Sequence, residues 1–158
     1  MIQLAKPDIL YTHNLADKHD THIGVTTKVI EAIRSLPVKD RPKALYGCEV
    51  WRDLDWLEDN HKVCLDASLY PELASELVKL FDSQIRGGKR YDLATLGRRL
   101  ANATFFQSHQ VDTSNAVTYA MDLTPLIKDD SLSITDYVTS FIDSFKQDVT
   151  QRIIRMIP

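Results

Sequence analysis

Cysteine is scarce in this 158-residue sequence, and long apolar runs are missing from it. The two cysteines, Cys48 and Cys64, both sit in strand-like apolar runs. We expect them to be buried thiols in adjacent strands rather than a disulfide, which suits a reducing cytoplasm. No apolar run approaches the roughly 20 residues that a membrane-spanning helix needs, and no signal peptide opens the chain. The sequence therefore predicts a cytoplasmic protein without a membrane partner.

The sequence also lacks an excess of positive charge. Its formal net charge is −3 and its Lys and Arg residues are scattered, which argues against nucleic acid as a partner. The densest basic cluster, residues 86–90 with Arg98 and Arg99, is matched by nearby acids, as expected of a solvated turn. Gly87 and Gly88 follow a helical segment instead of opening one. They therefore favour a helix C-cap over a phosphate-binding loop.

Apolar residues make up 44% of the chain, enough for a core, and the length fits a single domain over residues 1–158. Short apolar runs bounded by polar residues predict strands, and apolar residues at helical spacing predict helices. The expected strands are residues 8–11, 44–50, 62–66 and 115–123. The expected helices are residues 20–36, 68–86, 93–108 and 134–153. This order predicts an α/β fold with a partial Rossmann-like parallel sheet flanked by helices.

The last helix is the clearest of these elements. Ser133 and Asp136 form a capping box, and apolar residues then make one continuous stripe from Ile134 to Ile153. The opposite face holds acids as well as lysine. We therefore expect this amphipathic helix to pack on the sheet or on a neighbouring subunit rather than on a membrane surface.

The segment most informative about function is residues 7–22, PDILYTHNLADKHDTH. A short apolar run ends there in a loop dense in His and Asp, and a helical pattern then begins. Ligands of open α/β sheets bind outside the carboxyl ends of strands, where this loop is expected. His19 and His22 are three residues apart and share one side of the first helical turn. That side continues through Val25, Val29 and Ile33, so we expect both histidines to point inward.

Two such histidines with nearby aspartates are by themselves a modest zinc signal. A structural zinc site needs four ligands, and a catalytic one needs three plus water. The alternative is a histidine pair that is hydrogen-bonded to Asp17 or Asp20 at a helix start. Asp17 either orients a histidine ring or caps the helix, and the two roles are compatible. His13 either lines the pocket or bonds to the backbone of its loop.

Trp51 and Arg52 follow the strand ending at Val50 and also fall at a strand's carboxyl end. An aromatic ring beside an arginine suits a sugar or carboxylate ligand there, with Trp51 as a stacking surface and Arg52 as a bidentate donor. The alternative is a tryptophan packed under the sheet edge and an arginine paired with Asp53 or Asp55.

The loop segment resembles a motif of the LmbE-like or PIG-L family of zinc-dependent N-acetylglucosaminyl deacetylases. In that family a strand of the type Pro-Asp-hydrophobic-hydrophobic-x-Thr-His leads, after an Asp, to a His-Pro-Asp-His motif that opens a helix. Here residues 7–13 read PDILYTH, followed by Asp17 and by HDTH at residues 19–22. Asp20 and Thr21 depart from the Pro and Asp of the motif. The pair SQ at residues 83–84, and LGRR before ANATFF at residues 96–106, are similar to further family segments.

The resemblance implies a function and roles for individual residues. His22 would be a zinc ligand, and His19 would polarise the substrate carbonyl or protonate the leaving amine, with Asp17 supporting a histidine. His13, which matches the Thr-His of the family, would line the substrate pocket; Trp51 and Arg52 are assigned to that pocket by their place after a strand and not by the resemblance. The implied reaction is hydrolysis of an N-acyl group, acetyl above all, from an amino sugar or its conjugate.

The chain reads as the C-terminal two-thirds of such a deacetylase. The family's His-Pro-Asp-Asp motif, which supplies the other zinc ligands and the general base, is missing. We therefore expect this chain to hold Zn²⁺ weakly and to be inactive by itself. We also expect a homo-oligomer, or a pair with a complementing N-terminal fragment. The alternative is a non-catalytic remnant that acts as a binding or assembly module.

Overall fold

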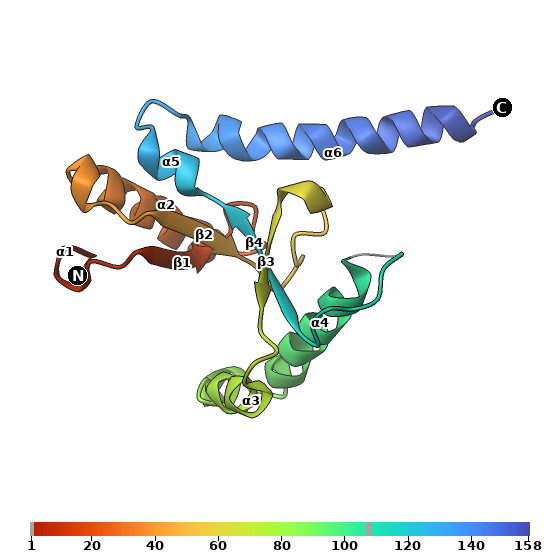
Figure 1. The fold of residues 1–158 in the computed structure, drawn as a ribbon, viewed down its shortest axis with the longest axis horizontal. Coiled ribbons are helices and arrows are strands. Elements are labelled where there is room, and N and C mark those ends of the chain that lie inside the picture. The colour runs from red at the N-terminus through yellow and green to blue at the C-terminus, as the bar shows by residue number, and fades with distance from the viewer. Residues whose placement is uncertain (1, 107–108) are drawn as a thin grey trace. The chain divides into compact units, whose positions relative to one another are not determined.

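The computed structural model describes residues 2–106 and 109–158, which form two compact units. Unit 1 comprises Met1–Val63 and Ala120–Pro158, and unit 2 comprises Cys64–Tyr119. The elements (Figure 1) are, in chain order, α1 (Ile2–Ala5), β1 (Ile9–His13), α2 (Asp20–Arg34), β2 (Ala44–Cys48), β3 (Lys62–Asp66), α3 (Pro71–Lys79), α4 (Tyr91–Phe105), β4 (Val117–Asp122), α5 (Thr124–Lys128) and α6 (Ile134–Met156). Within the described ranges, no helix combines the length and the apolar character needed to cross a membrane.

The four strands form a sheet in the order β1-β2-β4-β3. Strand β1 runs parallel to β2, with His13 opposite Cys48, whereas β2 and β4 are antiparallel. The predicted α/β class is confirmed, but the sheet is mixed, so the prediction of a parallel sheet is wrong for β4. An apolar strand that is buried on both faces has the same residue pattern whether it runs parallel or antiparallel to its neighbour. The sequence of β4 therefore could not indicate its direction.

The two cysteines are not joined by a disulfide. Cys48 on β2 is half-buried, and its burial raises the pKa of the thiol to about 11. Cys64 on β3 is exposed. Strand β4 lies between β2 and β3, so the prediction of two buried thiols in adjacent strands is wrong. The apolar run around Cys64 specified a strand without specifying which of its faces is covered.

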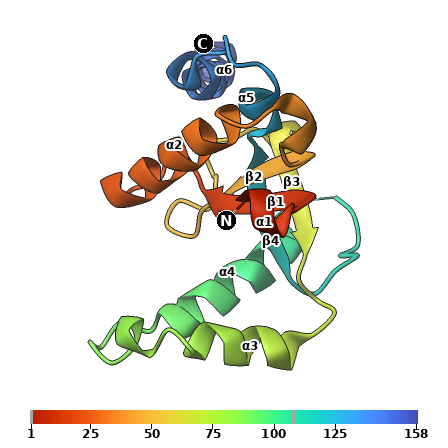
Figure 2. The ribbon, with the colours of Figure 1, turned by 90° about the vertical axis from the view of Figure 1, so that its left-hand side faces the viewer.

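The core of unit 1 includes residues of α2, the sheet and α5, and α2 lies against β1 and α5 (Figure 2). Thr26, Ile30 and Ile33 form the buried face of α2, while Val25 is half-exposed. The inner side of α2 therefore runs from His22 through Thr26 and not through Val25 as predicted. Thr26 occupies a core position because its hydroxyl donates a hydrogen bond to the carbonyl oxygen of His13 at 2.7 Å.

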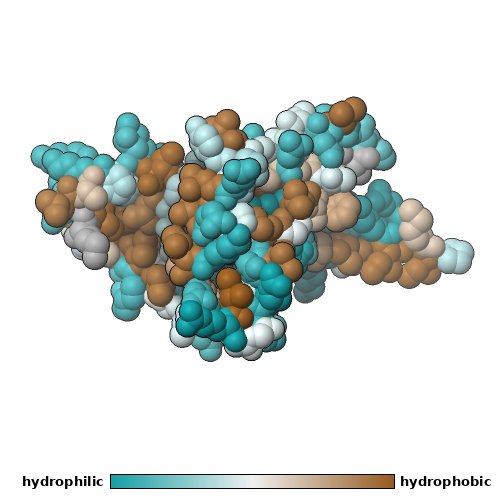
Figure 3. All heavy atoms as spheres, turned by 90° about the horizontal axis from the view of Figure 1, so that it is seen from below, coloured by the Kyte–Doolittle hydropathy of each residue, from teal (hydrophilic) through white to brown (hydrophobic). Residues whose placement is uncertain are grey.

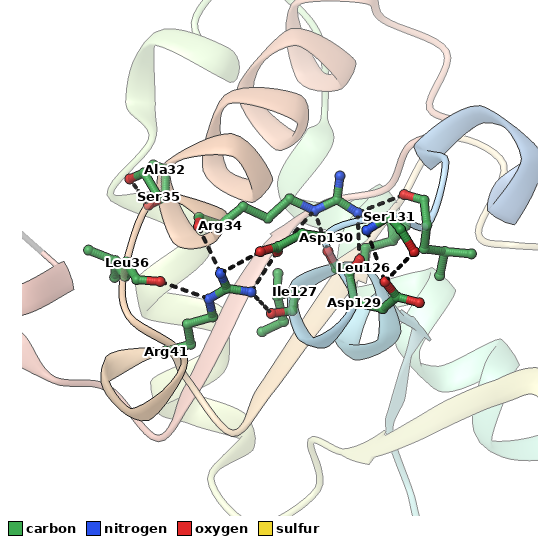
Figure 4. Close-up of polar contacts among 11 residues, drawn as sticks. Ala32, Arg34, Ser35, Leu36, Arg41, Leu126, Ile127, Asp129, Asp130 and Ser131 are labelled. Carbon is green, nitrogen blue, oxygen red and sulfur yellow. Dashed lines mark hydrogen bonds and ion pairs between the residues drawn. The ribbon is translucent and has the colours of Figure 1, made fainter.

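Two arginines fasten α5 and the α5–α6 connection to the rest of unit 1 (Figure 4). Arg34 donates to the carbonyl oxygens of Leu126 and Leu132, at 2.6 and 2.7 Å. Arg41 donates to the carbonyl oxygen of Ile127 and to both carboxylate oxygens of Asp130. These bonds satisfy backbone acceptors that the short helix α5 leaves at its end.

Helix α6 begins as the capping box predicts. The backbone N–H of Asp136 donates to Oγ of Ser133 at 3.2 Å. The first turns pack on unit 1, since Val138 is buried and the hydroxyl of Tyr137 donates to the carbonyl oxygen of Asp122 at 2.7 Å. The ring of Phe141 lies edge-on to the ring of His61, with centroids 5.0 Å apart.

Unit 2 is built around α3 and α4, which contact each other. Helix α3 begins at Pro71 rather than near Ser68, because proline favours the first turn of a helix. The Ser68 hydroxyl instead accepts hydrogen bonds from the backbone N–H groups of Asn115 and Ala116. Helix α4 is tied to β4 by Asn102, whose side chain donates to the Val117 carbonyl. Of the residues predicted to extend this helix, 107–108 lie outside the described part.

Candidate metal site

The candidate site lies in unit 1, where β1 ends and α2 begins. The backbone N–H of Asn14 donates to the Cys48 carbonyl at 3.0 Å and so extends the parallel ladder past His13. The Asn14 side chain then accepts from the N–H of Ala16 at 2.8 Å. One oxygen of the buried Asp17 accepts from the N–H of His19 at 2.8 Å. These two side-chain bonds fold the loop so that α2 starts at Asp20.

Three side chains converge at this turn. His13, Asp17 and His22 each offer one ligand atom, and these atoms all lie within 4.8 Å of one another. Nδ1 of His22 is 3.0 Å from Oδ1 of Asp17. This nitrogen is buried, yet it makes no hydrogen bond with the described part of the chain. A ring nitrogen and a carboxylate oxygen held side by side in this way fit a metal ion, and both are common zinc ligands.

The electrostatic surroundings of His13 favour its neutral form. Burial lowers the pKa of His13 most, and the neighbouring His22 lowers it further, while the charge of Asp17 raises it. The ring of His13 stacks on that of His22, with centroids 4.0 Å apart. A histidine binds metal through a neutral imidazole, and the lowered pKa of His13 favours that form. Each nitrogen lone pair lies in its own ring plane, so one of the two parallel rings would turn for both to bind the same ion.

His19 borders the three converging side chains without belonging to them. Its ring lies edge-on to that of His22 at 5.1 Å and edge-on to that of Trp51 at 4.9 Å. Trp51 is 40% exposed, and Nζ of Lys18 lies 5.2 Å from the centre of its ring. The structure thus brings Trp51 beside the predicted histidines.

Arg52 supports the loop that carries Asp17. Its guanidinium donates to the carbonyl oxygen of Ala16 at 2.6 Å, a bond between the segment after β2 and the segment after β1. Its backbone N–H donates to Oε1 of Glu49 at 3.2 Å. In this arrangement Arg52 contributes to the site by fixing the backbone next to Asp17.

Glu49 is a buried carboxylate beside Arg52 that was not predicted from the sequence. It is 2% exposed, and its Oε2 makes no hydrogen bond with any described residue. Burial raises the pKa of this carboxyl group, the backbone N–H of Arg52 lowers it, and the charge of Asp17 raises it. Glu49 directly follows β2, and the carboxyl-end rule that singled out Trp51 also applies to it.

Comparison of this chain with known protein families, curated proteins and solved structures finds no match. A function is therefore inferred from the residues of the site and from the motif at residues 7–22.

Proposed function

We propose that His13, Asp17 and His22 bind a zinc ion and that the resulting centre hydrolyses an N-acyl group. The observation that carries this proposal is the convergence of the three ligand atoms within 4.8 Å. Two histidines and one carboxylate that leave a fourth position open are typical of catalytic zinc sites. The approach of the buried Nδ1 of His22 to Oδ1 of Asp17, at 3.0 Å, supports the same assignment, because both atoms can bind one ion.

The ligand set proposed here is larger than the one expected from the sequence. The motif alone assigned zinc binding to His22 and gave supporting or substrate-binding roles to Asp17 and His13. With three side chains from this chain, we expect zinc to bind more tightly than a single histidine would allow. We therefore propose activity for the chain itself, in place of the weak binding and inactivity expected from the missing motif. Zinc in such a site acts as a Lewis acid and supplies a water-derived nucleophile near neutral pH.

His19 is the proposed acid. Its ring lies beside His22 but outside the ligand set, so its nitrogens remain able to interact with a substrate. As an imidazolium, His19 would donate a hydrogen bond to the carbonyl oxygen of the acyl group as negative charge develops there, and would then protonate the leaving amine. Asp17 holds the backbone N–H of His19 at 2.8 Å and thereby fixes the position of this residue.

The proposed substrate is an N-acetylated amino sugar or a conjugate of one. The resemblance of residues 7–22 to the deacetylase motif supports this class. The position of Trp51 supports it as well, because an exposed aromatic ring next to the histidines offers a flat surface for a sugar ring. Arg52 orients the loop that carries Asp17.

The test is acetate release by the zinc-loaded chain from a panel of N-acetylated amino sugars and their conjugates. We expect His22→Ala to lose zinc and turnover together. His19→Ala should retain zinc and lose turnover by about 10²-fold or more, because it acts only on developing charge and proton transfer. A chain that binds zinc but releases acetate from none of these substrates would contradict the proposal and favour a non-catalytic binding module.

A further inference from the structure

A groove in unit 1 lies at the amino ends of β1 and β2. It has a volume of about 460 Å³, and its lining comes from α1, from the residues just before β1 and from the connection between α2 and β2. Asp8 directly precedes β1 and Lys43 directly precedes β2, and the backbone N–H of Lys43 donates to the carbonyl oxygen of Asp8 at 2.8 Å. The candidate metal site lies at the opposite ends of these strands, about 15 Å along them. The groove is therefore separate from that site.

Basic side chains predominate around this groove, although the chain as a whole has a formal net charge of −3. The charged residues that line it are Lys6, Lys39, Arg41 and Lys43 together with Asp8 and Asp40. In Figure 3, hydrophilic side chains, in teal, project beside hydrophobic ones, in brown, at the left end, where Figure 1 shows α1. A groove in which cations exceed acids attracts anionic ligands.

The lysines of the groove are available to a ligand. Lys6 and Lys39 make no ion pair with a described residue. Lys43 pairs with Asp8 at 2.8 Å, but the two side chains are 81% and 74% exposed, and such an exposed pair is weak. An anion can therefore draw the ammonium group of Lys43 away from Asp8 at little cost.

Arg41 has a different role, because its donors are already used. Its side chain is 6% exposed and pairs with Asp130, and its remaining bonds go to three backbone carbonyl oxygens. It therefore fixes the wall of the groove and offers no free planar fork to a carboxylate ligand. The donors for a ligand come from the lysines, which bind phosphate as point charges.

The backbone of Lys6 supports a role for its side chain. Lys6 has a φ of 44°, in the left-handed region that favours glycine. Its N–H donates to the carbonyl oxygen of Ile2 at 2.8 Å and closes the end of α1, a position where glycine is common. A lysine in this strained conformation motivates a functional assignment, and its side chain lines the groove.

We propose that this groove binds the phosphate group of a small phosphorylated molecule through the ammonium groups of Lys6, Lys39 and Lys43. Each ammonium group offers three donors, and together they match the several oxygens of a phosphate. The volume of about 460 Å³ also leaves room for the molecule that carries the phosphate. The assignment is independent of the proposed metal centre and of its reaction.

The test is a calorimetric titration of the full chain with glycerophosphate, with glycerol as the uncharged control. We expect binding of glycerophosphate alone, weakening as the salt concentration rises. Lys6→Gln and Lys39→Gln should each lower the affinity by about fivefold or more, since each removes a charge next to the phosphate. Lys128→Gln is the matched control, because Lys128 is exposed on α5 and does not line the groove. His22→Ala should bind like the wild type, which separates this groove from the metal centre.

Lys6→Gly separates binding from folding. Glycine adopts the left-handed conformation of this position without strain, so the variant should unfold at the same temperature as the wild type or higher while its affinity for glycerophosphate falls. A wild type that does not bind glycerophosphate at low salt overturns the proposal, as does equal weakening by Lys39→Gln and Lys128→Gln. Binding to vesicles that contain phosphatidic acid, without binding of glycerophosphate, overturns the assignment to a small molecule.

Discussion

The rings of His13 and His22 lie face to face, with centroids 4.0 Å apart and planes 4° apart. One ring comes from the last residue of β1 and the other from the first turn of α2. Their stacking therefore depends on how closely α2 is held against the end of β1. The hydroxyl of Thr26 makes this connection, because it donates to the carbonyl oxygen of His13 at 2.7 Å.

Gly47→Ala should disturb the site from the neighbouring strand. A Cβ atom at Gly47 would lie 2.8 Å from Cδ1 of the buried Leu123 and 3.2 Å from the carbonyl oxygen of His13. We expect a loss of about 1–3 kcal/mol in the free energy of unfolding, the usual cost of overpacking, together with weaker zinc binding. Thermal unfolding and a zinc titration measure the two effects.

Gly24→Ala is the control for that substitution. Gly24 lies within α2, and a Cβ atom there would have no neighbour within 4 Å. Alanine should therefore stabilise the chain by roughly 0.5–1 kcal/mol, its advantage over glycine inside a helix. If both substitutions change stability in the same direction, the close approach at Gly47 does not govern the packing.

Arg41→Lys should destabilise unit 1 even though it preserves the charge. The side chain of Arg41 is 6% exposed and donates to three backbone carbonyl oxygens, those of Arg34, Leu36 and Ile127. A lysine ammonium cannot reach all of these acceptors from one position. We expect a loss of about 2–3 kcal/mol, measured by urea unfolding, because buried acceptors are left without donors.

The variant Asp130→Asn removes the ion pair of Arg41 and leaves its hydrogen bonds to the three carbonyl oxygens. The carboxylate of Asp130 is 57% exposed, and an exposed ion pair contributes about 1 kcal/mol or less. Asp130→Asn should therefore cost much less than Arg41→Lys. Equal losses for the two variants would place the importance of Arg41 in the ion pair rather than in the carbonyl bonds.

Asp92 should make the stability of unit 2 depend on acid pH. The guanidinium of Arg90 bonds both oxygens of Asp92, at 3.0 and 2.7 Å, and lowers the pKa of this carboxyl group from 3.8 to about 2. The unfolded chain thus binds the proton more readily than the folded chain does. The stabilisation is complete above pH 3.8 and is lost as the pH falls towards 2.

The variant Asp92→Asn tests this pH dependence. Its urea midpoint should lie below that of the wild type at neutral pH, and the two midpoints should meet near pH 2. A difference that stays constant between these pH values would show that Asp92 acts through packing and not through its charge.

Parts of this structure were predictable because their causes are local. Ser133 and the apolar stripe after it specify α6, and the spacing of His19 and His22 predicts that they lie together at the start of α2, where His19 is the N-cap residue and His22 is in the first turn. The direction of β4 and the inner face of α2 depend on contacts between distant segments. Thr26 is a core residue only because it meets the end of β1, and no local pattern indicates that contact.

The residues of the candidate site also differ in whether the sequence could predict them. His22 and Asp17 were identifiable from the motif in one loop. The position of His13 within ligand distance of them depends on the pairing of β1 with β2, with His13 opposite Cys48. Glu49 became recognisable through its burial, which follows from the packing around the end of β2. A single carboxylate after a short strand is too common in sequences to indicate that it is buried.

Zinc retention by the purified chain tests the proposed centre most directly. After dialysis against a mild chelator, we expect about one zinc per chain by elemental mass spectrometry, since the centre has one set of three protein ligands. His13→Ala, Asp17→Ala and His22→Ala should each lower zinc affinity by at least about tenfold, whereas His19→Ala should retain the metal. A wild type that keeps no zinc, or a His19→Ala variant that loses it as completely as His22→Ala, would contradict the assignment of His13, Asp17 and His22 as the metal ligands.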